Sequence, residues 1–173
     1  MMTRIAVLTA SLLVAGASLA QDQQAIRQQL FGATDAIKMQ AEALNAAVLA
    51  PKSFAEGMKL YEEAGDTLAK GRDLDSVRED LTEANGYFKQ AVDAATLAKT
   101  TFADTLMARD AAMKADSSKL AARDWQRAEQ SLAEAAEVLE GGNLKRATDM
   151  SMDAKKRYGE TEAKAINAKS KAQ

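Results

Sequence analysis

The sequence predicts an all-α protein, and three observations support this prediction. The composition favours helices, because alanine, glutamate, lysine and glutamine are abundant while there is one proline and only 5% aromatic residues. Small and apolar residues recur at alternating three- and four-residue steps, which is the spacing of one helix face. The pattern is also repeated along the chain with an offset of 71 residues. Phe54 and Trp125 occupy equivalent positions in the two repeats, and the residues around them match.

The first twenty residues are expected to be a cleaved signal peptide. Arg4 gives a positive start, an apolar run follows over residues 5–17, and Ser18-Leu19-Ala20 has the small-x-small form of a cleavage site. We therefore expect residues 1–20 to be removed and the mature chain to start at Gln21. An uncleaved N-terminal anchor is the alternative, although the apolar run is short for a membrane span.

Two helices are predicted next. The first covers residues 22–50 and ends before Pro51, because the residue preceding a proline is disfavoured in a helix. The second covers residues 54–70. It opens with a capping box, in which the Ser53 hydroxyl accepts from the amide of Glu56 and the Glu56 carboxylate reaches back.

The third helix is predicted to be long. Gly71 is the expected left-handed C-cap of the second helix, and the third starts near Asp73. Its three-four spacing continues over residues 73–121, which corresponds to a helix of about 70 Å. The alternative is a break at Asp116-Ser117-Ser118, whose side chains compete for backbone hydrogen bonds.

Two more helices complete the mature chain. Asp124 is the expected cap of a fourth helix over residues 125–140. Gly141 and Gly142 turn the chain into a fifth helix over residues 144–168. Residues 169–173 are expected to fray.

The repeat predicts a tandem architecture. Residues 21–95 and 96–168 form two three-helix units of about 71 residues, joined by the long helix as in spectrin-like tandem bundles. The alternative is a single compact helical bundle. The large residues of the helical stripes are the predicted core: Phe54, Tyr61, Leu68, Leu74, Leu81, Phe88, Trp125, Leu132, Leu139 and Tyr158.

Histidine and cysteine are both absent from the sequence. This excludes zinc sites built from those ligands, a Ser-His-Asp triad and a cysteine nucleophile. The carboxylates follow helix faces without a preferred pair, so we expect no enzymatic activity, no catalytic or metal-ligating residues and no cofactor.

The charge is uneven. Residues 144–173 carry eight basic and four acidic side chains, whereas residues 21–143 carry fourteen basic and twenty-one acidic ones. The acidic body argues against nucleic acid as a partner, while the basic last helix suits an acidic one. No segment after the leader is apolar enough to span a bilayer, so we expect no stable membrane insertion.

The repeated pattern resembles a known family. An Ala-Pro or Ala-Ala step, a capping residue with an aromatic, A-x-x-x-L-x-x-A, a glycine turn and A-x-x-x-x-x-x-A-x-x-x-Y resemble the Ala-rich helical domain DUF4398, best over residues 119–162 and more weakly over residues 49–91. The resemblance implies an exported protein of the bacterial envelope. Some members are lipoproteins or precede an OmpA-like peptidoglycan-binding domain. Here no cysteine follows the cleavage site and no such domain is present, so neither form of anchoring is expected.

The sequence therefore predicts a non-enzymatic periplasmic scaffold or interaction module that is not a lipoprotein. Its partner would be another envelope protein or a second copy, with the acidic body against the basic last helix. The alternative is a helical bundle that binds a small ligand or a metal, using the interior around Trp125 and the methionines.

Overall fold

The computed structural model describes residues 13–71 and 73–171, which form eight helices and no strand. The all-α prediction is therefore confirmed. Residues 1–12, which make up most of the expected signal peptide, lie outside the described residues, as do Arg72 and residues 172–173. The helices are α1 (Leu13–Ala43), α2 (Ala46–Leu49), α3 (Pro51–Ala69), α4 (Leu74–Thr101), α5 (Ala103–Lys114), α6 (Ser117–Leu120), α7 (Ala122–Glu140) and α8 (Leu144–Lys171).

The backbone repeats as the sequence does. Helices α3 and α7 each have 19 residues, and α4 and α8 each have 28. Asn45 before α2 and Asp116 before α6 both adopt left-handed angles, with φ of 61° and 62°. Asn and Asp are the non-glycine residues that tolerate this region best. Gly71 and Gly142 also have a positive φ, 64° and 82°, so each turn is built twice, 71 residues apart.

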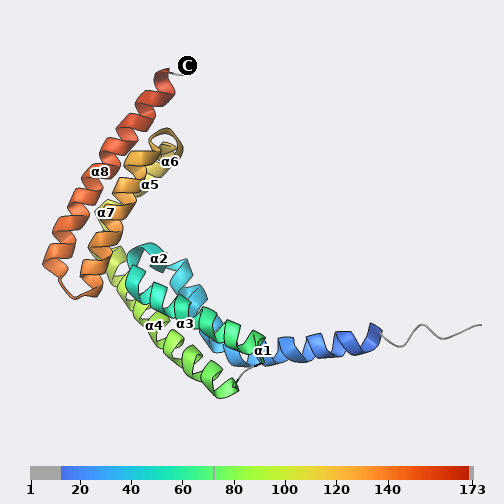
Figure 1. Cartoon of the computed structure of the whole chain (residues 1–173). Helices are drawn as coiled ribbons and strands as arrows, with labels where there is room; N and C mark the ends of the chain where they lie inside the picture. The colour runs from blue at the N-terminus through green and yellow to red at the C-terminus, as the bar shows by residue number, and fades with distance from the viewer. Residues whose placement is uncertain (1–12, 72, 172–173) are drawn as a thin grey trace, which may run out of the picture.

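The last helix of each half carries the buried stripe. Helix α4 contacts both α1 and α3, and α8 contacts both α5 and α7 (Figure 1). The Thr34 hydroxyl donates to the carbonyl of Leu81, and Thr105 donates to that of Ser151, so the same bond ties α1 to α4 and α5 to α8. The buried residues keep the predicted spacing: Val77, Leu81, Ala84, Phe88, Ala91, Ala95 and Ala98 on α4, and Ala147, Ser151, Ala154, Tyr158, Thr161 and Ala165 on α8.

The described chain forms a bent rod. Figure 1 shows one body made of α1–α4 and a second made of α5–α8, which meet at an angle. At the bend, α2, α3 and α4 all contact α7. Buried residues of both bodies, among them Leu49, Phe102 and Leu132, belong to one cluster. The division into units 21–95 and 96–168 therefore remains a prediction, because the core is continuous across it.

The helix predicted over residues 73–121 is divided. Helix α4 ends at Thr101, and Phe102 departs from helical angles with φ of −105° and ψ of 21°, although its amide still donates to Ala98 at 2.8 Å. Helix α5 then ends at Lys114, and Asp116 turns the chain. The prediction of one continuous helix is wrong, whereas its alternative, a break at Asp116, is observed.

The first predicted helix is divided in the same way. Helix α1 ends at Ala43, and the left-handed Asn45 separates it from α2. Pro51 does not end this helix but begins α3, where its fixed φ suits the first helical position and its missing amide costs nothing. At the other end of the chain, α8 stays helical through Lys171, so fraying from residue 169 is not observed in the part described.

The predicted caps of α3 and α7 are wrong. Ser53 is the third residue of α3, and its hydroxyl donates to Glu140 at 2.6 Å, so it forms no capping box with Glu56. Asp124 is the third residue of α7, and its carboxylate pairs with Lys164 at 2.9 Å. Both helices start three residues earlier than the capping pattern indicated, at Pro51 and Ala122.

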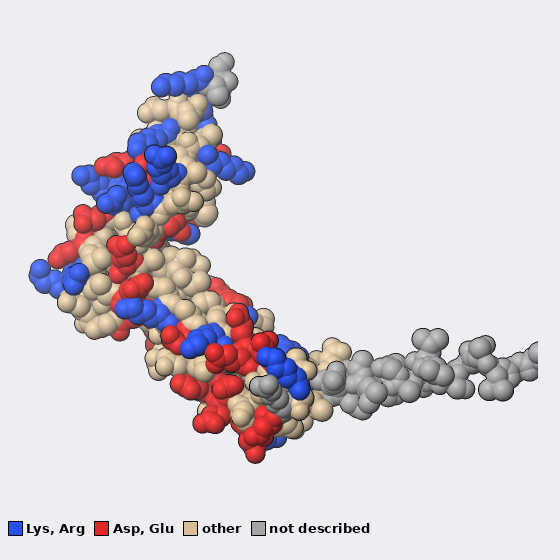
Figure 2. Space-filling view, viewed as in Figure 1, with Lys and Arg blue, Asp and Glu red and all other residues tan. Residues whose placement is uncertain are grey.

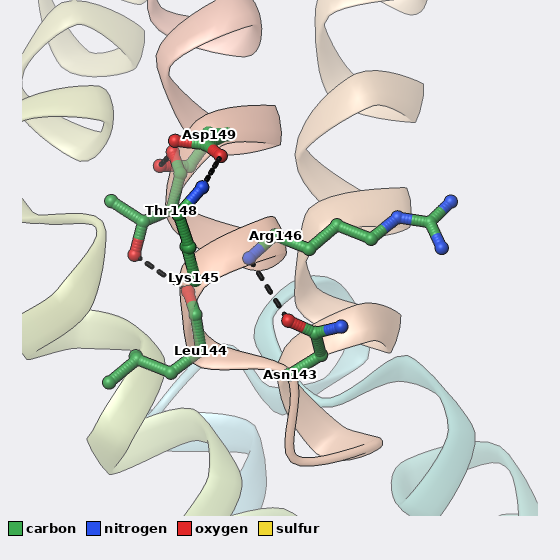
Figure 3. A network of polar contacts seen from close by, with 7 residues as sticks. Asn143, Leu144, Lys145, Arg146, Thr148 and Asp149 are labelled. Carbon is green, nitrogen blue, oxygen red and sulfur yellow. Dashed lines mark hydrogen bonds and ion pairs between the residues drawn. The ribbon is translucent and has the colours of Figure 1, made fainter.

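Helices α4 and α8 have side-chain caps. The carboxylate of Asp73 accepts from the amide of Asp75 at 3.0 Å at the start of α4. At the start of α8, the side-chain oxygen of Asn143 accepts from the amide of Arg146 at 3.1 Å (Figure 3). The same view shows Lys145 paired with Asp149 one turn further on.

Burial divides the predicted core residues into three groups. Leu81, Phe88, Leu132, Leu139 and Tyr158 are buried, and Phe54, Tyr61, Leu68 and Trp125 are half-buried. Leu74 is 40% exposed, so its assignment to the core is wrong; as the first residue of α4, it has no preceding turn to cover it. Phe31 and Phe102 are fully buried although the predicted core omitted them.

Candidate interaction surfaces

The bend is held by one carboxylate from the end of α7. The two oxygens of Glu140 accept hydrogen bonds from the amides of Lys52 and Ser53, both at 3.0 Å, and from the Ser53 hydroxyl. These amides lie in the first turn of α3, where they have no partner within the helix and where the helix dipole favours a negative charge. The Lys52 ammonium lies 3.5 Å from Glu137, one turn before Glu140. Polar contacts therefore fix α7 to the start of α3.

Sequence reasoning missed this contact. Ser53 was assigned to a local cap because serine three residues before glutamate is a common start signal. The signal that could have found the contact is a difference between the repeats, because Glu140 replaces Ala69. A carboxylate that appears in only one repeat unit indicates a contact that the other unit does not make in the same form.

A polar cluster ties together the three helices of the second half. The Glu129 carboxylate accepts from Arg109 Nε at 2.7 Å, from Arg109 Nη2 at 2.9 Å and from the Tyr158 hydroxyl at 2.6 Å. The Arg109 guanidinium lies 5.6 Å from the centre of the Trp125 ring, which meets the Tyr158 ring edge-on. Burial, followed by the bond to Glu129, raises the pKa of Tyr158. The bond to Glu129 also raises the pKa of Arg109.

The first half has a similar cluster at different positions. The Tyr61 hydroxyl donates to Asp35 at 2.5 Å and accepts from Arg27 at 3.1 Å. Its ring meets the Phe31 ring edge-on at 5.2 Å. Burial, followed by the bond to Asp35, raises the pKa of Tyr61. Tyr158 matches Phe88 in the repeat, so the two tyrosines do not occupy equivalent positions. In both clusters the polar groups bond to one another across helices, which suits a structural role.

An open groove runs between α1 and α4. It has a volume of about 650 Å³, and its lining includes Ile26, Leu30 and Leu74. The matching groove between α5 and α8 is smaller, about 250 Å³. Lys155 crosses it to Asp104 at 2.8 Å, and this hydrogen bond lowers the pKa of the Asp104 carboxyl. The first groove also has the charged Arg78 and Lys89 in its lining, so the two grooves differ in volume and in the ion pair that crosses the second.

Charge is distributed along the rod. Figure 2 shows basic side chains gathered on the body formed by α5–α8, and acidic side chains spread over the body formed by α1–α4. Exposed acidic residues surround the turn from α3 to α4, among them Glu62, Glu63 and Asp66. Exposed basic residues surround the opposite end, among them Lys119 and Arg123. The two ends of the molecule therefore carry opposite charge.

The methionines of the described residues are divided between exposed and partly buried positions. Four of them are exposed side chains on the outside of the helices, namely Met39, Met107, Met113 and Met152. Met58 and Met150 are partly buried against the core cluster that Trp125 also contacts. Among residues 24–71 and 73–171, no three carboxylates converge in a way that could hold a metal ion.

No described helix has a stretch long and apolar enough to cross a membrane. Comparison with protein-family models, curated proteins and solved structures finds no match for the chain.

Proposed function

We propose that the chain is a non-enzymatic helical scaffold, or interaction module, of the bacterial cell envelope. The observation that carries this proposal is the bent rod itself, in which α4 and α8 bury one stripe and expose the rest of their length. Each of these helices has 28 residues and so spans about 42 Å. Such an arrangement presents extended surfaces of defined charge, which is what binding to another protein requires.

The scaffold acts by holding two surfaces at a fixed angle. The continuous buried cluster and the bonds of Glu140 to α3 resist bending at the junction of the two bodies. The polar clusters at Tyr61 and Tyr158 resist separation of the helices within each body. A partner that contacts both bodies therefore meets a preorganised surface and loses little conformational entropy of the scaffold on binding.

The proposed location is the periplasm. The leader-like pattern of residues 1–20 and the resemblance to the Ala-rich envelope domain DUF4398 support it. The proposed partner is another envelope protein or a second copy of the chain. The net acidic body, with fourteen basic and twenty-one acidic side chains over residues 21–143, disfavours nucleic acid.

Two measurements on cells test this proposal. Fractionation followed by intact-mass measurement is expected to find the protein in the periplasm with Gln21 as its first residue. A photo-crosslinking amino acid at Leu97 or Met152, both exposed, is expected to give discrete protein adducts. Unprocessed protein in the cytoplasm would contradict the location. A complete lack of adducts from both positions, with the protein folded, would contradict the scaffold function.

The groove between α1 and α4 favours a second candidate, a binder of small apolar ligands. Its volume of about 650 Å³ lies in the range of ligand sites, and Ile26 and Leu74 line it with apolar side chains that are partly exposed. A thermal-shift screen of amphiphiles tests it: a rise in melting temperature that Leu74→Lys abolishes supports binding in this groove. No shift with any amphiphile argues against it.

A further inference from the structure

The contact at the bend joins two different surfaces, and the repeat supplies a second version of each. The first surface comprises α2 and the start of α3, and the second is the end of α7. The counterpart of the first is α6 with the start of α7, which lies at the far end of the second body. The counterpart of the second is the end of α3, at the far end of the first body (Figure 1). We call these the α6 end and the α3 end.

The α6 end is uncovered where its counterpart at the bend is covered. Leu49 in α2 is 1% exposed, whereas Leu120, 71 residues later in α6, is 42% exposed. Ala50 is fully buried, whereas its counterpart Ala121 is only half-buried. The α6 end therefore exposes apolar surface of the kind that α7 covers at the bend.

The α3 end is uncovered in the same way. Ala136 of α7 is fully buried, whereas its counterpart Gly65 in α3 has open space where a Cβ would lie. Leu139 is 4% exposed, whereas its counterpart Leu68 is half-buried. The two surfaces that meet at the bend therefore each have an uncovered counterpart, at the α6 end and at the α3 end.

One charge pair of the bend has a counterpart at the two ends, whereas Glu140 is replaced by Ala69 at the α3 end. At the bend, Lys52 Nζ lies 3.5 Å from a carboxylate oxygen of Glu137. Their counterparts, 71 residues away in each case, are Arg123 at the α6 end and Asp66 at the α3 end. The charges at these positions have the same signs as at the bend. A second copy that docked with the geometry of the bend would therefore place Arg123 against Asp66. The basic surroundings of the α6 end and the acidic surroundings of the α3 end add to this attraction.

We propose that a second copy of this chain docks its α3 end onto the α6 end of the first, with Arg123 of one copy paired with Asp66 of the next. The inference rests on the proposed scaffold function and deepens it by naming the partner. The contact is heterologous, since different surfaces meet, so each copy keeps one free α6 end and one free α3 end. Repeated addition therefore builds a head-to-tail chain rather than a closed dimer.

One overlap limits the strength of this contact. Residues 165–171 of α8 and residues 24–30 of α1 both correspond to residues 95–101 of α4, so only one of the two segments fits into the joint between copies. Residues 24–29 are all exposed, whereas Ala165 is fully buried. The start of α1 is therefore the segment that moves aside. Moving it breaks the hydrogen bond from Arg27 to Tyr61, and this cost makes the association reversible. Gln28→Pro, which disrupts this helical segment, should strengthen the association.

Charge reversal combined with mixing tests the proposal on the mature full-length chain. Sedimentation velocity at low ionic strength should show a wild-type sedimentation coefficient that rises with concentration and falls again in high salt. Arg123→Glu alone and Asp66→Arg alone each place like charges together, and each should weaken association at least about tenfold. An equimolar mixture of the two variants should recover it, because every contact between unlike variants pairs opposite charges and an alternating chain contains only such contacts. Lys145→Glu makes the same charge change away from both ends and should associate like the wild type.

The outcomes are distinct. Recovery in the mixture supports the pairing, because a folding defect in either variant would persist after mixing. A wild type that stays monomeric at all concentrations overturns the inference, as do single variants that associate like the wild type. If self-association is contradicted in this way but photo-crosslinking still yields adducts with another envelope protein, the proposed scaffold function is retained.

Discussion

A glycine-to-alanine pair in one helix tests the packing of the first body. Gly57 of α3 faces the Phe88 ring, and a Cβ at this position would lie 2.9 Å from two of its ring carbons. Phe88 is fully buried in α4 and also contacts the Phe54 ring, at 5.8 Å between ring centres. It therefore has little freedom to retreat. Gly65 lies two turns further along the same helix, and no atom lies within 4 Å of where its Cβ would be.

The magnitudes follow from two opposing effects. Either glycine, replaced by alanine within the helix, gains about 1 kcal/mol of helix propensity. Gly57→Ala must also push the ring aside, and overpacking of this kind costs about 1–3 kcal/mol. We therefore expect Gly65→Ala to raise the free energy of unfolding by about 1 kcal/mol. Gly57→Ala should leave it unchanged or lower it by up to about 2 kcal/mol.

Urea unfolding followed by circular dichroism measures both variants. The difference between them, about 1–3 kcal/mol, isolates the contact with Phe88, because helix propensity cancels. Equal stabilisation by both substitutions would refute the reasoning, since it would mean that Phe88 does not pack against Gly57. The second body carries Ala128, fully buried, at the position that matches Gly57, so the restriction belongs to the spacing of α3 and α4 and not to the repeat as such.

Three further predictions concern the polar contacts and the turns. Tyr158→Phe should lower the free energy of unfolding by about 1–3 kcal/mol in urea titrations, because Glu129 loses a donor. Since the pKa of Tyr158 is raised in the fold, wild-type stability should hold below the ordinary tyrosine pKa of about 10 and fall as the pH rises above it, and the variant should show a smaller fall. Glu140→Ala should cost about 1–2 kcal/mol, like the loss of a helix cap, and change the radius of gyration in small-angle scattering, whereas Ser53→Ala, which keeps both amide donors, should change the radius little. Asn45→Gly should raise the melting temperature, because glycine adopts the left-handed angles at lower cost, and an unchanged or lower value would contradict the strain assigned to this turn.

Periodicity was the most reliable signal in the sequence. The three-four spacing on α4 and α8 correctly placed the stripe that faces the neighbouring helices, because burial of one face depends on local spacing alone. Gly71 and Gly142 correctly indicated the turns that close α3 and α7. Asn45 was missed as a turn because helix-forming residues surround it, and no proline or glycine lies within five residues on either side.

Contacts between distant segments account for the remaining errors. The capping-box pattern at Ser53 was overridden by Glu140, which lies 87 residues away. Helix α3 also has Pro51 at its first position, which moves its start three residues ahead of the predicted one. The cluster at Glu129 joins residues from α5, α7 and α8, and no local rule connects them. Side chains that bond across helices depend on how the helices pack, which the sequence pattern does not specify residue by residue.

The differences between the two repeat units affect the strength of self-association. In α2, which is covered at the bend, the sequence is Ala46-Ala47-Val48-Leu49, whereas in α6 it is Ser117-Ser118-Lys119-Leu120. The backbone turn before each helix is the same, so the substitutions do not serve the turn. At positions 118 and 119 they replace Ala47 and Val48 by polar side chains on a surface that meets water whenever the chain is alone, whereas Ser117 is fully buried; the exposed Leu120 and the nearby Arg123 remain. Less apolar area is then buried when a second copy docks than when α7 covers α2, so the contact between copies must be weaker than the contact at the bend. A greater share of its stability comes from charge, which is why association should depend steeply on salt while the fold of each copy does not.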